Sequence, residues 1–353
     1  MVEEFKKPKI VVDVQMLSRN ELTGMGRYIQ ELLPHLFKYE EFEWITKKPR
    51  SIKGYRTLWE HTILPITSLL EKADVLFSPS NIVPFYLPKK IKLIVTVHDV
   101  RVKVFPETFS RSTRMYYDFI YSFLFKRANL IITVSEFSRS EILKYFPEAK
   151  NKIYVIPNGI NTQKFKFLDL PRKKQILLIG ALAKHKNISV VLKAFQKIYN
   201  TIPHNLIIVG SKDSGMPQDE EMKQIMRQIP SDRVIFTGRL SDDEVVNLYN
   251  ESEVFVFPSL YEGFGLPVLE AMACGCPVIA SNRASLPEVC GDAAIIFNPD
   301  DPDELSEKIF QLVQNDNVKE TLRKKGFERI KLFSWESIAK QYIDLIKKVL
   351  KHE

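Results

Sequence analysis

The sequence predicts an α/β fold made of two doubly wound parallel sheets, one after the other along the chain. Short apolar segments of strand length alternate with helical segments in both halves of the 353 residues. This alternation is typical of parallel sheets that are covered by helices. A turn cluster at Pro157–Ile160 separates the two series. We therefore expect a first domain over residues 1–160 and a second domain over residues 161–334.

The first half contains five segments with the length and apolar composition of buried strands. Helical segments lie between them, and the first long helix opens near two glycines, Gly24 and Gly26. The expected strands are Ile10–Val14, Asp74–Ser78, Leu93–Val97, Leu130–Val134 and Ile153–Ile156, and the expected helices include Gly26–Phe37, Arg111–Arg127 and Phe137–Phe146.

The second half repeats the pattern with six strands. They are expected at Ile176–Ile179, Leu206–Val209, Val234–Thr237, Val254–Phe257, Val278–Ala280 and Ala294–Phe297. After the fourth strand, Pro267 stands where a helix would begin and Gly275 where it would stop. The resulting βαβ unit places its loop at the carboxyl end of a strand, where open α/β sheets bind ligands.

The residues of this loop indicate the chemistry of the ligand. The free backbone N–H groups of Phe264, Gly265 and Leu266 would point out of the helix N-terminus and favour an anion. Glu262 and Glu270 flank these amides, and carboxylates accept hydrogen bonds from sugar hydroxyls. Amides for a phosphate beside carboxylates for hydroxyls suit a nucleotide sugar. An acidic loop that only caps a helix is the alternative for such a pair of glutamates.

Two features of the first half also follow expected strands. Gly24 and Gly26 would let backbone amides approach a phosphate, although glycines there also suit a turn with positive φ. His98 directly follows the strand Leu93–Val97, which should bring its imidazole out of the core and into a ligand cleft. Asp99 either orients that imidazole or caps the local turn.

Composition narrows the class of protein. With 45% apolar and 27% charged residues, the chain resembles an ordinary globular protein. Its three cysteines lack metal-site spacing and support neither a disulfide framework nor a zinc site. We find no signal-peptide core and no apolar run long enough for a membrane span, so a cytoplasmic location is expected.

The net charge of +8 lies entirely in the first half. Residues 1–160 hold 25 Lys and Arg against 17 Asp and Glu, whereas residues 161–353 hold 26 of each. A basic half favours an anionic partner, such as a membrane surface or a diphosphate-linked acceptor, or it serves only solubility. Nucleic acid is not expected as a partner, because no compact basic run or known binding motif accompanies the charge.

Several strings of this sequence resemble glycosyltransferase family 4. The longest runs from Pro258 to Pro267, continues from Glu270 to Ile279 and ends with Leu286–Val289, and it is similar to the donor site of retaining members. In the first half, strings similar to a mannosyltransferase branch occur in order at Thr23–Tyr28, Thr96–Val100, Phe105–Glu107, Val134–Ser138 and Ile156–Ile160.

This resemblance implies the GT-B fold, in which two Rossmann-like domains face a cleft. The last helix, from Ser334 through Leu350, would cross back, so that residues 1–160 with about 335–353 form the acceptor-side domain. Residues 161–334 would bind the nucleotide sugar. The implied reaction moves a hexose, with mannose from GDP-mannose favoured, to a hydroxyl of a glycan or lipid-linked acceptor in cell-surface polysaccharide synthesis. It would proceed with retention and without a metal or cofactor.

The resemblance also implies roles for the matching residues. Lys186, helped by Lys184 or His185, would stabilise the departing diphosphate, and Glu270 would hold the ribose hydroxyls. Glu262 would bind the transferred sugar, and His98 would position it from the other domain without acting as a nucleophile. The implied donor-binding residues are Gly24, Gly26, His185, Lys186, Glu262, Gly263, Phe264, Gly265, Leu266 and Glu270.

One motif departs from the family pattern. The family has an arginine just after Gly180 or beside Lys186, where this chain has Ala181 and His185. The departure favours a binding-only relative, which stays open as an alternative together with a UDP-sugar donor and a sugar-nucleotide epimerase. Asp301–Asp303 matches the D-x-D pattern by which another glycosyltransferase fold binds metal, but a helix cap at Asp301 explains it. No metal site is expected.

The helix expected at Arg111–Arg127 is rich in aromatic residues and has cations at both ends. Arg111, Arg114, Lys126 and Arg127 could hold it on an anionic membrane at the inner face. Packing against the first sheet is the alternative, and it is favoured because the aromatic residues occur on more than one face of the helix.

Overall fold

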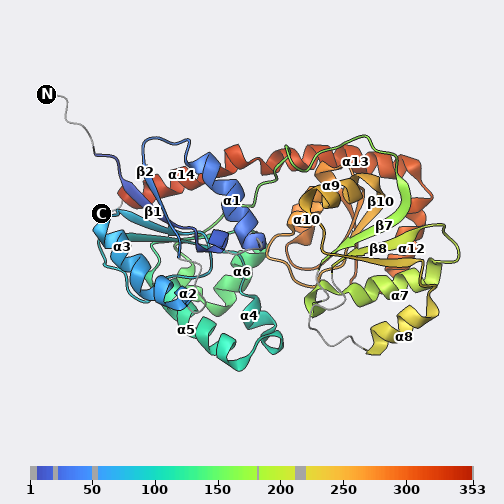
Figure 1. Ribbon diagram of the computed structural model, residues 1–353, viewed down its shortest axis with the longest axis horizontal. Helices are drawn as coiled ribbons and strands as arrows, with labels where there is room; N and C mark the ends of the chain where they lie inside the picture. The colour runs from blue at the N-terminus through green and yellow to red at the C-terminus, as the bar shows by residue number, and fades with distance from the viewer. Residues whose placement is uncertain (1–5, 19–22, 50–54, 181–182, 211–219, 352–353) are drawn as a thin grey trace. The chain divides into compact units, whose positions relative to one another are not determined.

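The computed structural model describes residues 6–18, 23–49, 55–180, 183–210 and 220–351. The chain divides into two compact units. Unit 1 is Met1–Gly159 with Trp335–Glu353, and unit 2 is Ile160–Ser334. Within the described residues, each unit contains a parallel sheet of six strands flanked by helices (Figure 1). The predicted α/β class with two parallel sheets is confirmed.

The sheet of unit 1 has the strand order β2-β1-β3-β4-β5-β6. Its strands are β1 (Lys9–Asp13), β2 (Glu43–Lys47), β3 (Val75–Ser78), β4 (Lys92–Val97), β5 (Leu130–Thr133) and β6 (Ile153–Val155). The five expected strands are present, whereas β2 was not predicted from the sequence. β2 is an edge strand that pairs only with β1, and none of its side chains is fully buried. It therefore lacks the apolar run that marks a central strand.

Helices cover both faces of this sheet. Ile10 and Val12 of β1 join one core with helices α1 and α14, whereas Val11 joins the other core with α3 and α5, as the alternation of side chains along a strand requires. The helices are η1 (Gln15–Ser18), α1 (Gly24–Leu36), α2 (Tyr55–Leu58), η2 (Trp59–Ile63), α3 (Leu64–Leu70), α4 (Arg101–Val104), η3 (Pro106–Thr108), α5 (Arg111–Arg127), α6 (Glu136–Tyr145), η4 (Pro147–Ala149) and α14 (Trp335–Lys351).

The last helix returns to unit 1, as the sequence predicts. The Tyr342 hydroxyl of α14 lies 2.6 Å from the Tyr28 hydroxyl of α1, inside the core. At the start of α14 the Trp335 ring packs so closely on Gly159 that a Cβ atom there would clash with it. The C-terminal residues are therefore a structural part of the first unit.

The sheet of unit 2 has the order β12-β11-β10-β7-β8-β9, and all six expected strands are present. They are β7 (Lys173–Ile179), β8 (Asn205–Val209), β9 (Val234–Gly238), β10 (Ser252–Phe257), β11 (Val278–Ser281) and β12 (Ala294–Phe297). The helices are η5 (Lys184–Lys186), α7 (Ile188–Ile198), α8 (Glu220–Gln228), α9 (Asp242–Glu251), α10 (Leu266–Ala273), α11 (Leu286–Cys290), α12 (Pro302–Val313), α13 (Asp316–Ile330) and η6 (Lys331–Phe333).

No helix in the described part of the chain combines the length and the apolarity that are needed to cross a bilayer.

Helix α10 ends where the sequence predicts, at Gly275. The N–H of Gly275 donates to the carbonyl of Met272 at 3.0 Å, and the N–H of Cys276 donates to the carbonyl of Ala271 at 2.8 Å. This pair of bonds is the Schellman motif, and it needs the left-handed φ of 68° that Gly275 adopts. The chain can therefore turn directly from α10 into β11.

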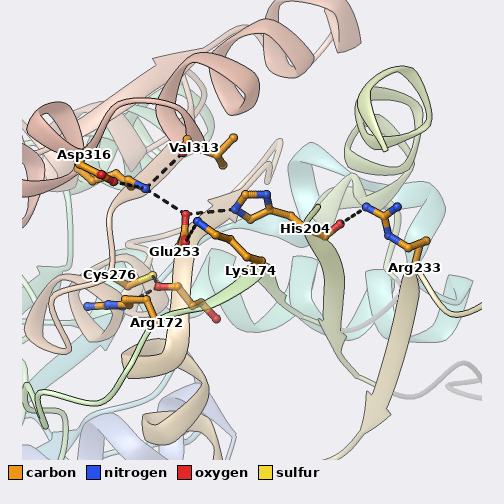
Figure 2. Close-up of polar contacts among 10 residues, drawn as sticks. Arg172, Lys174, His204, Arg233, Glu253, Cys276, Val313 and Asp316 are labelled. Carbon is orange, nitrogen blue, oxygen red and sulfur yellow. Dashed lines mark hydrogen bonds and ion pairs between the residues drawn. The ribbon is translucent and has the colours of Figure 1, made fainter. Parts of the chain in front are cut away.

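A charge cluster around the buried Glu253 ties strands of unit 2 together at their amino ends (Figure 2). The Glu253 carboxylate of β10 accepts hydrogen bonds from His204 at 3.1 Å, Lys174 at 2.8 Å and Lys319 at 3.0 Å. Burial alone would raise the pKa of Glu253, but these three donors outweigh it and lower the pKa to about 2. The cluster lies at the edge of the sheet opposite the expected donor site.

Candidate functional site

The sheet of unit 2 reverses its direction of growth between β7 and β10. From β7 the chain adds β8 and β9 on one side, and it then adds β10, β11 and β12 on the other side. The loops that leave two such central strands diverge, and open α/β sheets bind ligands at this point. Here these loops are the segment after β7, which carries η5, and residues 258–265, which precede α10.

The structure brings Lys186 and Glu262 into direct contact at this point. The Lys186 Nζ atom lies 2.5 Å from Glu262 Oε1, and the two side chains are 21% and 17% exposed. The ammonium group also lies 5.4 Å from the centre of the Phe257 ring, at the end of β10. The cation expected to meet the diphosphate and the carboxylate expected to bind the sugar are therefore an ion pair within reach of solvent.

Two buried serines that the sequence did not single out hold the loop that carries Glu262. The Ser285 hydroxyl lies 3.0 Å from the carbonyl oxygen of Glu262 and 2.6 Å from that of Phe264. The Ser281 hydroxyl donates to the carbonyl of Ser259 at 2.6 Å. Because serine is a common turn and loop residue, no sequence signal distinguishes these two from others.

The N-terminus of α10 lies at the position that the sequence predicts. Gly265 precedes Leu266, the first helical residue, and has φ of 110°. A Cβ atom on Gly265 would lie 2.8 Å from the Leu286 side chain, so both the backbone angle and the space require glycine. Phe264 is buried and packs edge-on against Phe333. These contacts hold the first amides of α10 beside the Glu262 loop.

Glu270 lies one turn inside α10 and is only 8% exposed. The Tyr249 hydroxyl of α9 lies 3.2 Å from Glu270 Oε2. Burial, together with the nearby carboxylate, raises the pKa of Tyr249 well above its usual value, so this hydroxyl stays protonated and can donate. Tyr249 was not found from the sequence, because it is distant from the motif and looks like any core tyrosine.

Of the two positions where the family has an arginine, the structure describes only His185. His185 is buried, and its backbone carbonyl accepts a hydrogen bond from the N–H of Leu260 at 2.8 Å. This bond links η5 to the loop that carries Glu262. Ala181, the other departure from the family pattern, lies outside the described residues.

In unit 1, Gly24 and Gly26 both belong to the first turn of α1, which begins two residues earlier than predicted. Neither has a positive φ, so a turn conformation does not explain them. The N–H of Gly26 donates to the Thr23 side chain, which caps the helix, at 3.3 Å. A Cβ atom on Gly24 would meet no described atom within 4 Å. The space beside Gly24 is open.

His98 follows β4 and is half-buried, with its ring fixed on two sides. Its Nε2 atom lies 3.2 Å from the carbonyl oxygen of Pro79, and its ring packs edge-on against the Tyr28 ring at 4.6 Å. Burial lowers the pKa of His98 below 6.5, although the Pro79 carbonyl and the Asp99 charge oppose it. In the neutral ring Nε2 carries the proton, because a carbonyl can only accept.

Tyr28 is a further residue of this region whose role the sequence did not show. Its hydroxyl is held by Thr96 at 3.2 Å and by Tyr342. Asp99 Oδ1 accepts a hydrogen bond from the N–H of Arg101 at 3.0 Å, which is the local turn cap that the sequence left open. The imidazole of His98 is therefore oriented by Pro79 and Tyr28.

The D-x-D string acts as a helix cap. Asp301 Oδ1 accepts from the N–H groups of Asp303 and Glu304, both at 3.0 Å, at the start of α12. Across the described ranges, no group of three or more His, Cys, Asp or Glu side chains gathers in a way that could hold a metal ion.

Comparison with known proteins agrees with this architecture. The family model "Glycosyltransferase Family 4" matches residues 34–164, and the model "Glycosyl transferases group 1" matches residues 160–329. Together they extend over both units.

Known mannosyltransferases match this chain over different shares of its length. The O-antigen chain mannosyltransferase B of Escherichia coli is 30% identical over 92% of this chain and 96% of that protein. The O-antigen chain mannosyltransferase RfbU of Salmonella typhimurium is 32% identical over 59% of this chain and 57% of its own length. A solved sucrose-phosphate synthase from Thermosynechococcus elongatus aligns with a TM-score of 0.77 at 21% identity, covering 98% of this chain and all of that one, which shows the shared fold. The chain therefore belongs to glycosyltransferase family 4 and is a glycosyltransferase with the GT-B fold.

Proposed function

We propose that this glycosyltransferase moves a mannosyl group from GDP-mannose to a hydroxyl of a glycan or lipid-linked acceptor in cell-surface polysaccharide synthesis, with retention of configuration. The observation that carries the proposal is the match to a mannosyltransferase along 92% of this chain. The strings in the first half that resemble the mannosyltransferase branch support the same sugar.

The charges of unit 2 support a diphosphate donor. Lys186 and the amides at the start of α10 lie on the two loops that diverge after β7 and β10, so both would face the same anion. In the structure the Lys186 Nζ atom pairs with Glu262 Oε1 at 2.5 Å. We propose that the donor exchanges these partners: its diphosphate takes over Lys186, and Glu262 is released to accept hydrogen bonds from hydroxyls of the sugar.

The remaining roles follow the same chemistry. Glu270, held by Tyr249, is assigned to the ribose hydroxyls, and His98 is assigned a contact with the transferred sugar. For retention we propose attack by the acceptor hydroxyl on the face that the diphosphate leaves. The bond from the sugar to the diphosphate breaks, the bond to the acceptor oxygen forms, and the leaving phosphate takes the acceptor proton.

A panel of donors tests the proposal. The purified protein is incubated with GDP-mannose and with UDP-hexoses, with and without an acceptor glycan, and the released nucleoside diphosphate is measured. We expect release that requires GDP-mannose and increases with acceptor. If nucleoside diphosphate is released from a UDP-hexose and not from GDP-mannose, the donor is a UDP-sugar and the proposed donor is wrong. Nucleotide release without any acceptor would indicate an epimerase, and binding without release would indicate a binding-only relative.

Replacing His98 by alanine is expected to lower kcat by about 10²-fold or more while donor affinity changes little, because a contact to the transferred sugar matters most in the transition state. The measurement compares kcat with the Kd of GDP-mannose. Asp99→Asn is the matched control, since asparagine can keep the cap on Arg101, and kcat should stay within about twofold. If His98→Ala weakens donor binding as much as it lowers kcat, the residue is structural.

Activity is expected to persist in EDTA, because the diphosphate charge is met by Lys186 and by helix amides in this proposal. The rate of transfer is measured after removal of the chelated metal, and Mn²⁺ or Mg²⁺ is then added back. A rate that collapses in EDTA and returns with either ion would contradict the proposed roles.

A further inference from the structure

Helix α5 leaves one face uncovered. Its residues Ile120, Tyr121, Leu124 and Phe125 are buried against the sheet, so the packing expected from the sequence accounts for that face. Met115 and Phe119 instead are 65% and 59% exposed. They stand four residues apart on one side of the helix, between the exposed Arg111 at one end and the exposed Lys126 at the other.

The loop between β3 and β4 extends this apolar face. The Phe85 ring packs edge-on against Phe119, with ring centres 4.9 Å apart, and it stacks on His61 at 3.5 Å. The next residue, Tyr86, is 71% exposed. An aromatic side chain with a polar end suits the boundary between water and an apolar phase.

The segment that carries this apolar patch is rich in cations. Residues 86–127 contain nine Lys and Arg against three Asp and Glu, which accounts for most of the surplus charge of the first half. Lys89 and Lys90 follow Tyr86 and are exposed. Arg127, in contrast, donates to the carbonyls of Leu87, Pro88 and Ile91, and thereby fixes this loop to the end of α5. Arg127 therefore positions the loop and is not one of the cations offered to a partner.

A pocket of about 280 Å³ adjoins the same end of α5. It is lined by Lys92, Asn129, Leu130, Asn151, Lys152, Tyr154, Lys348 and Val349. These lining residues, which all lie in the described part of the chain, include three cations and no carboxylate. Lys152 Nζ donates to the carbonyl of Lys126 at 2.9 Å, so one lining lysine contacts the end of the helix. Ammonium groups of this kind bind anions, phosphate groups among them.

We propose that unit 1 docks on a bilayer surface that contains anionic phospholipid, through Tyr86, Met115 and Phe119 together with Lys89, Lys90 and Lys126. The three apolar side chains would enter the interfacial region, and the lysines would meet the phosphate headgroups. The charge selects this occupant. An apolar patch alone would also suit a protein partner, but cations that outnumber acids three to one in this segment favour an anionic surface, although the exposed Asp118 of α5 pairs with Lys103.

Sedimentation with vesicles tests this docking surface. The protein is mixed with phosphatidylcholine vesicles with or without phosphatidylglycerol, at low and at high ionic strength. We expect binding to the anionic vesicles at low salt and release as the salt rises, because salt screens exposed charges beyond about 8–10 Å. The test uses neither donor nor acceptor, so its outcome is independent of the function proposed above.

Variants separate the apolar and the charged parts of the surface. Met115→Ser with Phe119→Ser, and Lys89→Glu with Lys90→Glu, should each weaken vesicle binding about tenfold or more. The controls are two single variants of unit 2: Leu332→Ser changes an exposed apolar residue, and Lys324→Glu changes an exposed lysine. Both should leave binding unchanged. The proposal would be overturned if the unaltered protein did not bind anionic vesicles at low salt, or if both double variants bound as well as the two controls.

Discussion

Replacing Lys186 by methionine is expected to lower kcat by about 10²–10³-fold, the usual effect of removing one preorganised group that stabilises developing negative charge. Methionine keeps most of the length of the side chain but loses the ammonium group, which in the structure pairs with Glu262 at 2.5 Å. The measurement is kcat for mannosyl transfer, together with thermal unfolding to show that the fold is retained. Lys193→Met is the matched control, because Lys193 also pairs with a glutamate of unit 2, Glu221 at 2.7 Å. It should keep near-native turnover.

A second background shows whether Lys186 acts on the diphosphate or only on Glu262. In the Glu262→Gln protein the carboxylate charge is already absent, so Lys186 has no charge to neutralise there. If Lys186 stabilises the departing diphosphate, Lys186→Met should still lower kcat strongly in this background. A double variant as active as Glu262→Gln alone would mean that the lysine merely balances the glutamate, and the proposed role would be wrong.

Glu270→Ala should weaken the binding of GDP-mannose by about 1.5–3 kcal/mol, roughly 10–150-fold in Kd, as expected for hydrogen bonds to a charged group. Glu270 is 8% exposed, and the Tyr249 hydroxyl lies 3.2 Å from its Oε2 atom. Calorimetric titration with GDP-mannose and with GDP measures the change. Because the ribose is common to both ligands, both affinities should fall by a similar factor.

Tyr249→Phe gives a graded version of the same test. It removes only the hydroxyl that faces Glu270, so donor affinity should fall by about 0.5–1.5 kcal/mol. Glu307→Ala changes an exposed glutamate of α12 and should leave nucleotide binding unaltered. If Glu270→Ala leaves the nucleotide affinity unchanged, this carboxylate serves the packing of α9 on α10. The substitution would then lower only the temperature of thermal unfolding.

The strands that could be predicted are those that the fold buries on both faces. Val254–Phe257 is a continuous apolar run and Leu93–Val97 is apolar except for Thr96, because helices cover both sides of a central parallel strand. The same reasoning could not find β2, because Glu43–Lys47 is an edge strand with polar residues at its ends. The spacing of apolar residues reveals a helix or a strand only where one side of that element is buried more than another.

The donor loop likewise has features that the sequence predicts and features that it does not. Its glycine at 265 is required locally, by a φ of 110° and by the nearby Leu286 side chain, and its helix start is signalled by Pro267. The sequence thus located the loop with Glu262 and the following helix with Glu270. It gave no indication of Ser285 or Tyr249, because a hydroxyl that holds a carbonyl or carboxylate from another element has no local pattern.

By itself, the sequence determined the α/β class, the two series of strands, the family, and the loop–helix segment in which Glu262 and Glu270 lie eight residues apart. These properties depend on periodicity and on short strings, which are local along the chain. Only the tertiary structure decided that Lys186 pairs with Glu262, 76 residues away, that Tyr28 and Pro79 hold His98, and that Met115 and Phe119 are left uncovered on α5. Each of these outcomes depends on the order of strands in a sheet and on which face of a helix is buried, because distant residues meet only through that order.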